Sequence, residues 1–171
     1  MKTKLTITFL ILLVIWGVYD VAQHYKTQIG IKVGNRSPTI TLKNVNGQRS
    51  KLTDFKGDIV IVNFWATWCT PCQNELPVLN KFYNEHKKQK TVILGINATS
   101  TEKDQQHVIT FSKNNRINYP ILLDTKGRYS DLFQVKGYPT TYFIDSRGII
   151  KKIYVGQITA KKLKSILSTI Q

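Results

Sequence analysis

The sequence contains only two cysteines, Cys69 and Cys72, and three histidines among its 171 residues. A zinc site would need two ligands besides the cysteines, and the histidines have no ligand-like spacing. Covalent haem attachment would need a histidine directly after the second cysteine, where this chain has Gln73. The sequence therefore predicts no metal site and no bound cofactor.

Acidic residues are scarce as well, with ten Asp and Glu against 25 Lys and Arg and a formal net charge of +15. The basic residues are scattered and no nucleic-acid-binding motif is present, so we do not expect nucleic acid as a partner. Two interpretations of the charge stay open. It either covers a solvated surface or attracts an anionic membrane surface or wall polymer.

Charged residues are absent from Leu5 to Tyr19, which follow Lys2 and Lys4 near the N-terminus. As a helix, this run would span only about 22 Å at about 1.5 Å per residue, whereas a bilayer core measures about 30 Å. A cleaved signal peptide and an uncleaved signal-anchor both fit such a segment. Asp20 stands where a cleavage site favours a small residue, and no cysteine follows that could carry a lipid. We therefore expect an uncleaved signal-anchor, a transmembrane helix, at residues 1–22, then a linker at 23–36 and one domain at 37–171.

Strand-like and helix-like segments alternate along the predicted domain. Asn46-Gly47 is a strong turn signal between two short strands and predicts an N-terminal β-hairpin. We expect strands at residues 39–45, 49–52, 59–64, 92–96, 119–123, 140–145 and 149–155. Helices are expected from Pro71 to about 86–89, from Thr101 to Asn114, at 126–133, and from a Thr159 cap to about Ile170, with a turn or short helix at 53–57. This order predicts an α/β fold, a three-layer sandwich around a mixed sheet, extended by the hairpin.

The two cysteines lie at a predicted strand-to-helix junction, in the segment Trp68-Cys69-Thr70-Pro71-Cys72. Unpaired N–H groups and partial positive charge at a helix N-terminus stabilise a thiolate, which is the reactive form in disulfide exchange. We expect Cys69, at the mouth of the helix, to be the exposed nucleophile, and Cys72, one turn further on, to be the resolving thiol. Pro71 has no N–H and suits the first helical turn.

A purely structural disulfide is the main alternative for this pair. Structural disulfides usually link distant segments of a chain. A link between residues three apart closes so small a loop that it stabilises the fold little, and this favours a redox-active dithiol.

Two further polar residues, Glu75 and Asn63, are close to the pair in sequence. Glu75 follows Cys72 by one helical turn. It is either a first-turn acid favoured by the helix dipole or a group that raises a cysteine pKa and relays its proton. Asn63, on the incoming strand, is either a hydrogen-bonded core residue or part of the active site.

A second motif, Gly137-Tyr138-Pro139-Thr140-Thr141, precedes a predicted strand. Proline at the first residue of a strand has no N–H to donate to the ladder. A cis peptide bond between Tyr138 and Pro139 is compatible with this position.

Together, the segment from Asn63 to Cys72 and the Gly137–Thr141 motif resemble the active-site signature and the substrate-side loop of the thioredoxin superfamily. The resemblance extends from about Gly34 to the C-terminus. Within the superfamily, the chain is most similar to the membrane-anchored, extracytoplasmic thiol-disulfide oxidoreductases of the TlpA/ResA type, because of its N-terminal hairpin and Glu75. The resemblance implies a thioredoxin-like fold in which a cis Pro139 faces the cysteines.

The resemblance also implies site residues and partners. The implied catalytic residues are Cys69, Cys72 and Glu75, and the implied substrate-binding residues are Trp68, Thr70, Pro71, Tyr138 and Pro139. Such proteins reduce disulfide bonds in exported proteins, including apocytochrome c in some members, with electrons from a membrane thiol-disulfide relay. We therefore expect a single-pass protein of the cell membrane with its domain on the extracytoplasmic side.

Two departures from the family pattern leave the direction of electron flow open. Thioredoxin has a buried Asp where this chain has Asn63. The dipeptide Thr70-Pro71 differs from those of thioredoxin and ResA, and this dipeptide helps to set the reduction potential in the superfamily. A disulfide-donating oxidase of the same fold, a non-catalytic thioredoxin-fold binding module and a peroxide reductase are the alternatives.

Overall fold

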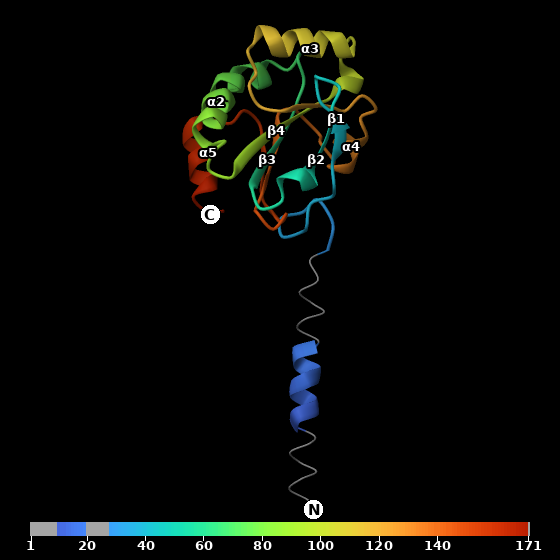
Figure 1. The fold of residues 1–171 in the computed structure, drawn as a ribbon, viewed down its shortest axis with the longest axis vertical. Helices are drawn as coiled ribbons and strands as arrows, with labels where there is room; N and C mark the ends of the chain where they lie inside the picture. Colours follow the sequence, from blue (N-terminus) through green and yellow to red (C-terminus); the bar gives the residue numbers. More distant parts are fainter. Residues whose placement is uncertain (1–9, 20–27, 171) are drawn as a thin grey trace, which may run out of the picture.

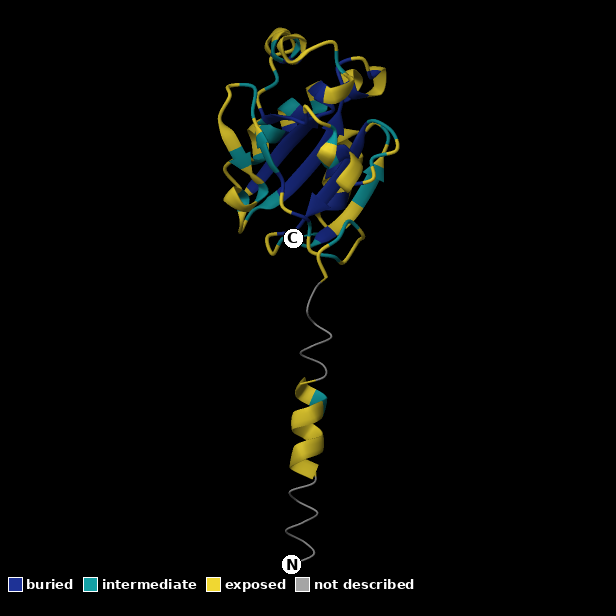
Figure 2. Ribbon diagram, turned by 90° about the vertical axis from the view of Figure 1, so that its right-hand side faces the viewer, coloured by how far each residue is buried: buried dark blue, intermediate teal, exposed yellow. Residues whose placement is uncertain are grey.

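The structure, a computed structural model, describes residues 10–19 and 28–170 of the chain. Residues 10–19 form a helix whose side chains are mostly exposed and apolar (Figure 2). Within the described ranges, no helix is both long enough and apolar enough to cross a membrane. The other residues of the expected signal-anchor, 1–9 and 20–22, lie outside the described part of the chain.

A five-stranded mixed sheet forms the centre of the domain, as the sequence predicts (Figure 1). Its strands are β3 (Ile59–Trp65), β4 (Thr91–Asn97), β5 (Ile121–Leu123), β6 (Thr140–Ile144) and β7 (Ile150–Val155), in the spatial order β5-β4-β3-β6-β7. β3, β4 and β5 are parallel, whereas β6 and β7 are antiparallel to their neighbours. The central strands read as nearly unbroken apolar runs because helices or loops cover both faces of the sheet.

Helices α2 (Thr70–His86), α3 (Gln105–Asn114) and α5 (Ala160–Leu167) pack on one face of the sheet. The other face is covered by α4 (Arg128–Leu132), the 3₁₀-helix η1 (Leu52–Phe55) and the hairpin β1–β2 (Thr41–Lys43 and Arg49–Lys51). Figure 1 shows α2 and α5 on the left of the sheet, with the hairpin and α4 on the right. Alternate residues of β3 serve the two faces: Ile61 and Trp65 point toward α2, and Val62 and Phe64 point the other way. The predicted three-layer arrangement with an N-terminal hairpin is confirmed.

The predicted elements are confirmed in type and order, and most differ from the structure only at their ends. The turn at Asn46-Gly47 places Gly47 at a positive φ of 80°, which glycine adopts without strain. The Thr159 hydroxyl accepts a hydrogen bond from the Lys162 N–H and caps α5, as expected, although this helix ends at Leu167.

The predicted start of α3 at Thr101 is wrong. Residues Thr99–Thr101 form a separate 3₁₀ turn, and α3 begins at Gln105 with Asp104 as its N-cap. The Asp104 carboxylate accepts a hydrogen bond from the His107 N–H at 2.7 Å, which satisfies one of the free donors of the first turn. Glu102, two residues before this N-cap, instead accepts hydrogen bonds from the Thr67 N–H and Asn97 Nδ2.

Part of the segment expected to be a linker lies against the domain. Gly34 donates its N–H to Ile150 O at 2.8 Å, and Arg36 forms an antiparallel bridge with Ile149 next to β7. The guanidinium of Arg36 also donates to Arg147 O at 2.9 Å. Residues 23–27 of that segment lie outside the described residues.

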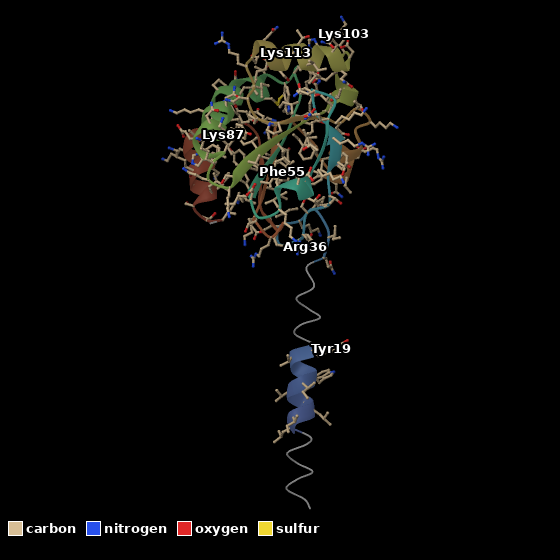
Figure 3. The ribbon with its side chains drawn as sticks, viewed as in Figure 1. Tyr19, Arg36, Phe55, Lys87, Lys103 and Lys113 are labelled. Carbon is tan, nitrogen blue, oxygen red and sulfur yellow. A yellow bond between two sulfur atoms is a disulfide. The ribbon has the colours of Figure 1, made fainter. Side chains whose placement is uncertain are left out.

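The basic side chains are spread over the surface of the domain. Figure 3 shows Lys87, Lys103 and Lys113 on the outside of the molecule, and all three are exposed. They come from the end of α2, from the loop before α3 and from α3 itself, so the labelled cations do not form one compact patch.

Candidate redox site

The two cysteines sit where β3 ends and α2 begins. Cys69 is the N-cap residue of α2, with an extended backbone, and its Sγ accepts a hydrogen bond from the Cys72 N–H at 3.2 Å. The helix thus directs its free N–H groups and the positive end of its dipole at the Cys69 sulfur. The predicted place of Cys69 at the mouth of the helix is confirmed.

Cys69 and Cys72 form a disulfide bond, with their Cα atoms 5.2 Å apart. This separation is ordinary for a disulfide, so one helical turn holds both redox states with little movement of the chain. Only 5% of the Cys69 surface is exposed, and Cys72 is fully buried. The expectation of an exposed Cys69 is therefore wrong for the disulfide form, although Cys69 is the more accessible of the two sulfurs.

Glu75 is fully buried in the second turn of α2, and no acid occupies the first turn. Its Oε1 accepts a hydrogen bond from Asn63 Nδ2 and its Oε2 accepts one from the Ile158 N–H, both at 2.8 Å. Burial raises the pKa of Glu75 from 4.5 to about 7, although these two hydrogen bonds favour the charged form. The interpretation of Glu75 as a first-turn acid is wrong. The carboxyl group is instead close to half-protonated at neutral pH.

Asn63 connects the buried acid to the neighbouring strand. Its Nδ2 donates both to Glu75 and to Thr141 Oγ1, the latter at 3.1 Å, and Asn63 lies opposite Thr141 in the β3–β6 pairing. Because asparagine is a neutral donor, it holds the Glu75 carboxylate without adding a second negative charge. The interpretation of Asn63 as a hydrogen-bonded core residue is confirmed, and its partner is the candidate acid.

The second motif reaches the cysteine loop from β6. The Tyr138–Pro139 peptide bond is cis, as the motif suggests, and Pro139 O accepts a hydrogen bond from the Gly156 N–H at 2.8 Å. The rings of Tyr138 and Trp68 meet edge to face with centroids 5.7 Å apart, which brings the two motifs together. Trp68 is nevertheless 56% exposed.

The other predicted substrate-side residues differ in their exposure. Thr70 and Pro71, in the first turn of α2, are exposed, whereas Pro139 is buried and Tyr138 is half-buried. The contact between Trp68 and Tyr138 thus joins the cis-proline loop to the loop that carries Cys69.

Glu102 is a site residue that the sequence did not indicate. Its Oε1 accepts hydrogen bonds from the Thr67 N–H at 2.7 Å and from Asn97 Nδ2 at 2.9 Å, and its Oε2 accepts one from the Thr67 hydroxyl. The neighbouring Thr101 hydroxyl accepts a hydrogen bond from Trp68 Nε1 at 3.2 Å. The turn after β4 thereby fixes two consecutive residues of the cysteine loop. The position of Glu102 after β4 was the one indication of this contact in the sequence. The carboxyl ends of the adjacent parallel strands β3 and β4 meet at one edge of the sheet, so the residues that follow them lie close together.

Within residues 10–19 and 28–170, no group of three or more Cys, His, Asp or Glu side chains is arranged to hold a metal ion. The residues described above offer the chemistry of a cysteine pair and a buried acid. The sulfurs exchange disulfide bonds, and Glu75 exchanges a proton near neutral pH.

Comparison with known proteins agrees with this chemistry. Residues 33–153 match the AhpC/TSA family. The chain is 39% identical over 168 residues to the thioredoxin-like protein YneN of Bacillus subtilis, covering 98% of each sequence. It is 32% identical over 166 residues to the thiol-disulfide oxidoreductase ResA of Geobacillus thermodenitrificans, covering 97% of this chain and 94% of that one. A solved structure of a thiol:disulfide interchange protein DsbE from Chlorobium tepidum is similar with a TM-score of 0.75 at 26% identity, over 82% of this chain and 99% of the other.

Proposed function

Since the chain belongs to the AhpC/TSA family and is a thiol-disulfide oxidoreductase, we propose that it reduces disulfide bonds in exported proteins. The observation that carries this proposal is the Cys69–Cys72 pair at the N-terminus of α2, with the fully buried Glu75 one turn beyond Cys72. A dithiol needs both a stabilised thiolate and a group that accepts the second thiol proton, and this arrangement supplies both.

The reaction begins with the dithiol form. The Cys69 thiolate attacks one sulfur of a target disulfide, the target S–S bond breaks, and the second target sulfur leaves as a thiolate that takes a proton from solvent. Cys72 then loses its proton, and its thiolate attacks Cys69 Sγ and displaces the first target sulfur. Two electrons pass from the dithiol to the target, which leaves as a dithiol while Cys69 and Cys72 form the disulfide.

Glu75 is the proposed acceptor of the Cys72 proton. With a pKa raised to about 7, its carboxyl group is partly deprotonated at neutral pH and is basic enough to take a proton from a thiol. Asn63 and the Ile158 N–H orient the carboxylate through one hydrogen bond to each oxygen. Because Cys72 is fully buried, a proton acceptor inside the protein replaces the solvent that cannot reach this sulfur.

The proposed substrate surface is made by the residues around Cys69. Trp68, which precedes Cys69, and Tyr138 form an aromatic wall, and Pro139 follows Tyr138 in the same loop. Thr70 and Pro71 are exposed in the first turn of α2. A protein substrate would contact these residues as its disulfide approaches Cys69.

We also propose a cell-membrane location with the domain on the extracytoplasmic side, and a membrane thiol-disulfide protein as the electron donor. The support is the uncharged run from Leu5 to Tyr19 behind two lysines, together with the exposed apolar helix of residues 10–19. Disulfide substrates are available outside the cytosol, and a reductant there must receive electrons through the membrane. Apocytochrome c is one proposed substrate among exported proteins.

Trapping of mixed disulfides tests this proposal. In a Cys72→Ser variant, Cys69 attacks but no resolving thiol follows, so substrates should stay attached to Cys69 through a bond that dithiothreitol releases. A Cys69→Ser/Cys72→Ser variant is the matched control and should trap nothing. If the double Cys→Ala variant retained the cellular role of the protein, the domain would be a binding module and the proposal would be wrong.

A further inference from the structure

Two large apolar side chains are exposed on one short loop at the start of the domain, residues 28–36. Ile29 is 74% exposed and Val33 is 58% exposed, and no large apolar side chain of residues 28–170 is more exposed than Ile29. Both cations of this N-terminal loop, Lys32 and Arg36, are exposed as well. Single apolar residues are normal at a protein surface, whereas exposed apolar groups rimmed by polar residues mark interaction sites.

Backbone hydrogen bonds hold the N-terminal loop in one shape. The Gly30 N–H donates to Arg36 O at 3.0 Å and the Arg36 N–H donates to Gln28 O at 2.9 Å, so the two ends of the loop lie side by side. Further along, the Asn35 N–H donates to Lys32 O at 3.0 Å, and Asn35 Oδ1 accepts from the Lys32 N–H at 3.1 Å. The two exposed apolar side chains therefore belong to a folded loop.

The loop is attached to the end of the sheet that lies away from the cysteines. The Gly34 N–H donates to Ile150 O at 2.8 Å and the Ile150 N–H donates to Asn35 O at 2.9 Å, where β7 begins. The adjacent strand β6 ends at Ile144, opposite Val60 near the start of β3, whereas the cysteines follow the other end of β3. β3 has seven residues, so at about 3.3 Å per residue it separates the two ends of the sheet by roughly 20 Å.

Further cations lie around the loop. Ile29 and Arg36 line a cavity of about 280 Å³ together with Phe55, Lys56 and Arg147. These shared walls place Lys56 and Arg147, both exposed, beside the loop.

Two acids, Asp58 and Asp145, line the same cavity. Asp145 Oδ2 lies 3.1 Å from Arg147 Nη2, so these two charges balance each other within one turn. Asp58 then stands alone against the three remaining cations of this end: Lys32, Arg36 and Lys56. The exposed apolar loop thus lies in a surface of positive charge.

We propose that this end of the domain docks on the surface of an anionic lipid membrane, with Ile29 and Val33 in the interfacial layer. The cations beside them contact lipid phosphates. The inference rests on the proposed cell-membrane location, and only residues 20–27 separate the loop from the exposed apolar helix of residues 10–19. Apolar side chains flanked by cations bind such surfaces through buried apolar area and attraction to anionic lipids.

Docking determines which way the redox site faces. With the start of β3 at the lipid, its other end and the Cys69–Cys72 pair point away from the membrane, toward exported proteins. Each cation near an anionic surface contributes only about a factor of five to binding, so the contact is reversible. A membrane-embedded electron donor reaches the cysteines when the domain leaves the surface.

The experiment uses the full-length protein in lipid nanodiscs, either of phosphatidylcholine alone or of phosphatidylcholine with phosphatidylglycerol. A lipid that carries a gadolinium chelate weakens the amide NMR signals of residues near the lipid surface. In the anionic nanodiscs we expect loss of signal at residues 28–36 and 146–148, and little loss at residues 136–138 beside the aromatic wall. Equal losses at both ends of the domain, or a greater loss at the cysteine end, would overturn the proposal.

A charge-reversal variant tests the attraction to lipid phosphates. Lys32→Glu/Lys56→Glu should lower the ratio of docked to free domain by about 25-fold or more, from about a factor of five for each cation removed. Lys103→Glu/Lys113→Glu changes the net charge equally and is the matched control, since Figure 3 shows Arg36 at the lower end of the domain and both of these lysines at the upper end. The same effect in both variants would show that only net charge matters.

An apolar variant separates the docking surface from the proposed location. Ile29→Ser/Val33→Ser should abolish the selective loss of signal, whereas Leu132→Ser, at an exposed position of α4, should retain it. Both should reduce a small soluble disulfide as fast as the wild type. If the selective loss survived in Ile29→Ser/Val33→Ser, the docking surface would be wrong. If the wild-type chain did not float with phosphatidylcholine vesicles, the proposed membrane location would be wrong as well.

Discussion

Asn63 Nδ2 lies 2.8 Å from Glu75 Oε1, so a neutral amide on β3 holds the buried acid of α2. This contact joins the strand before the cysteines to the helix after them, directly behind the disulfide. It also explains how a chain with asparagine at position 63 can keep an acid at this site: the acid comes from the helix, and the strand supplies its hydrogen-bond donor.

Replacing the amide by a second acid should destabilise the protein as pH rises. In Asn63→Asp, two buried carboxyl groups would lie within hydrogen-bond distance of each other. They can share one proton, but ionising both costs free energy because two negative charges would then be buried side by side. We expect the free energy of unfolding at pH 8 to fall by at least about 3 kcal/mol relative to the wild type, with a smaller loss at pH 5. Urea denaturation at the two pH values measures this. An equal loss at both would show that the carboxyl groups do not interact.

Glu75 should make the stability of the oxidised protein depend on pH. Its pKa rises from 4.5 to about 7 on folding, so between these values the folded state holds a proton that the unfolded state has released. The free energy of unfolding therefore falls as pH rises through this window, by about 3 kcal/mol in total, and the stabilisation is complete only below pH 4.5. Glu75→Gln should flatten this dependence in urea denaturation. The disulfide stays intact throughout, so the cysteines do not titrate.

Glu102 should stabilise the cysteine loop through its three hydrogen bonds. Glu102→Ala leaves the buried Thr67 N–H and the Asn97 amide unpaired, and we expect it to cost about 1–3 kcal/mol of unfolding free energy. Glu102→Gln keeps an acceptor and should retain most of the stability. Glu85→Ala, which removes an exposed acid of α2, is the control. The losses of unfolding free energy are measured by calorimetry or urea denaturation. Equal losses in Glu102→Ala and Glu85→Ala would contradict the role of Glu102.

Trp68 should affect protein substrates more than small ones. Trp68→Ala removes the exposed indole beside Cys69, and we expect the rate of reduction of a protein disulfide to fall by about tenfold, as for a central contact residue of an interface. The rate with a small disulfide such as hydroxyethyl disulfide should change little, because that molecule does not reach the aromatic wall. Leu132→Ala, an exposed apolar residue of α4, serves as the control. Equal losses with both substrates would indicate a damaged cysteine loop.

The features that the sequence predicted are local ones. The cysteine pair, the preceding strand and the start of the helix are close together in the sequence. The order of the predicted strands and helices was enough to predict the mixed sheet and the three layers. The expectation that Pro139 faces the cysteines came from resemblance to a known family. The cis bond and the contact between Tyr138 and Trp68 agree with it.

The features that the sequence did not predict depend on distant partners. Glu102 meets Thr67 across 35 residues, whereas Asp104, two residues further on, caps α3. Burial raises the pKa of Glu75, and a hydrogen bond that opposes this rise comes from the Ile158 N–H, 83 residues away. Local periodicity carries no information about such contacts, because they form only when the sheet brings its strand ends together.

The central claim, that this protein is a reductant, is tested most directly by the reduction potential of the Cys69–Cys72 pair. The purified protein is equilibrated with thiol–disulfide buffers of defined potential, and the fraction of disulfide is measured. We expect a value near that of thioredoxin, about −270 mV, so that the dithiol gives up its electrons readily. A value near about −120 mV, that of DsbA, would contradict it and identify a protein that donates disulfides to its substrates.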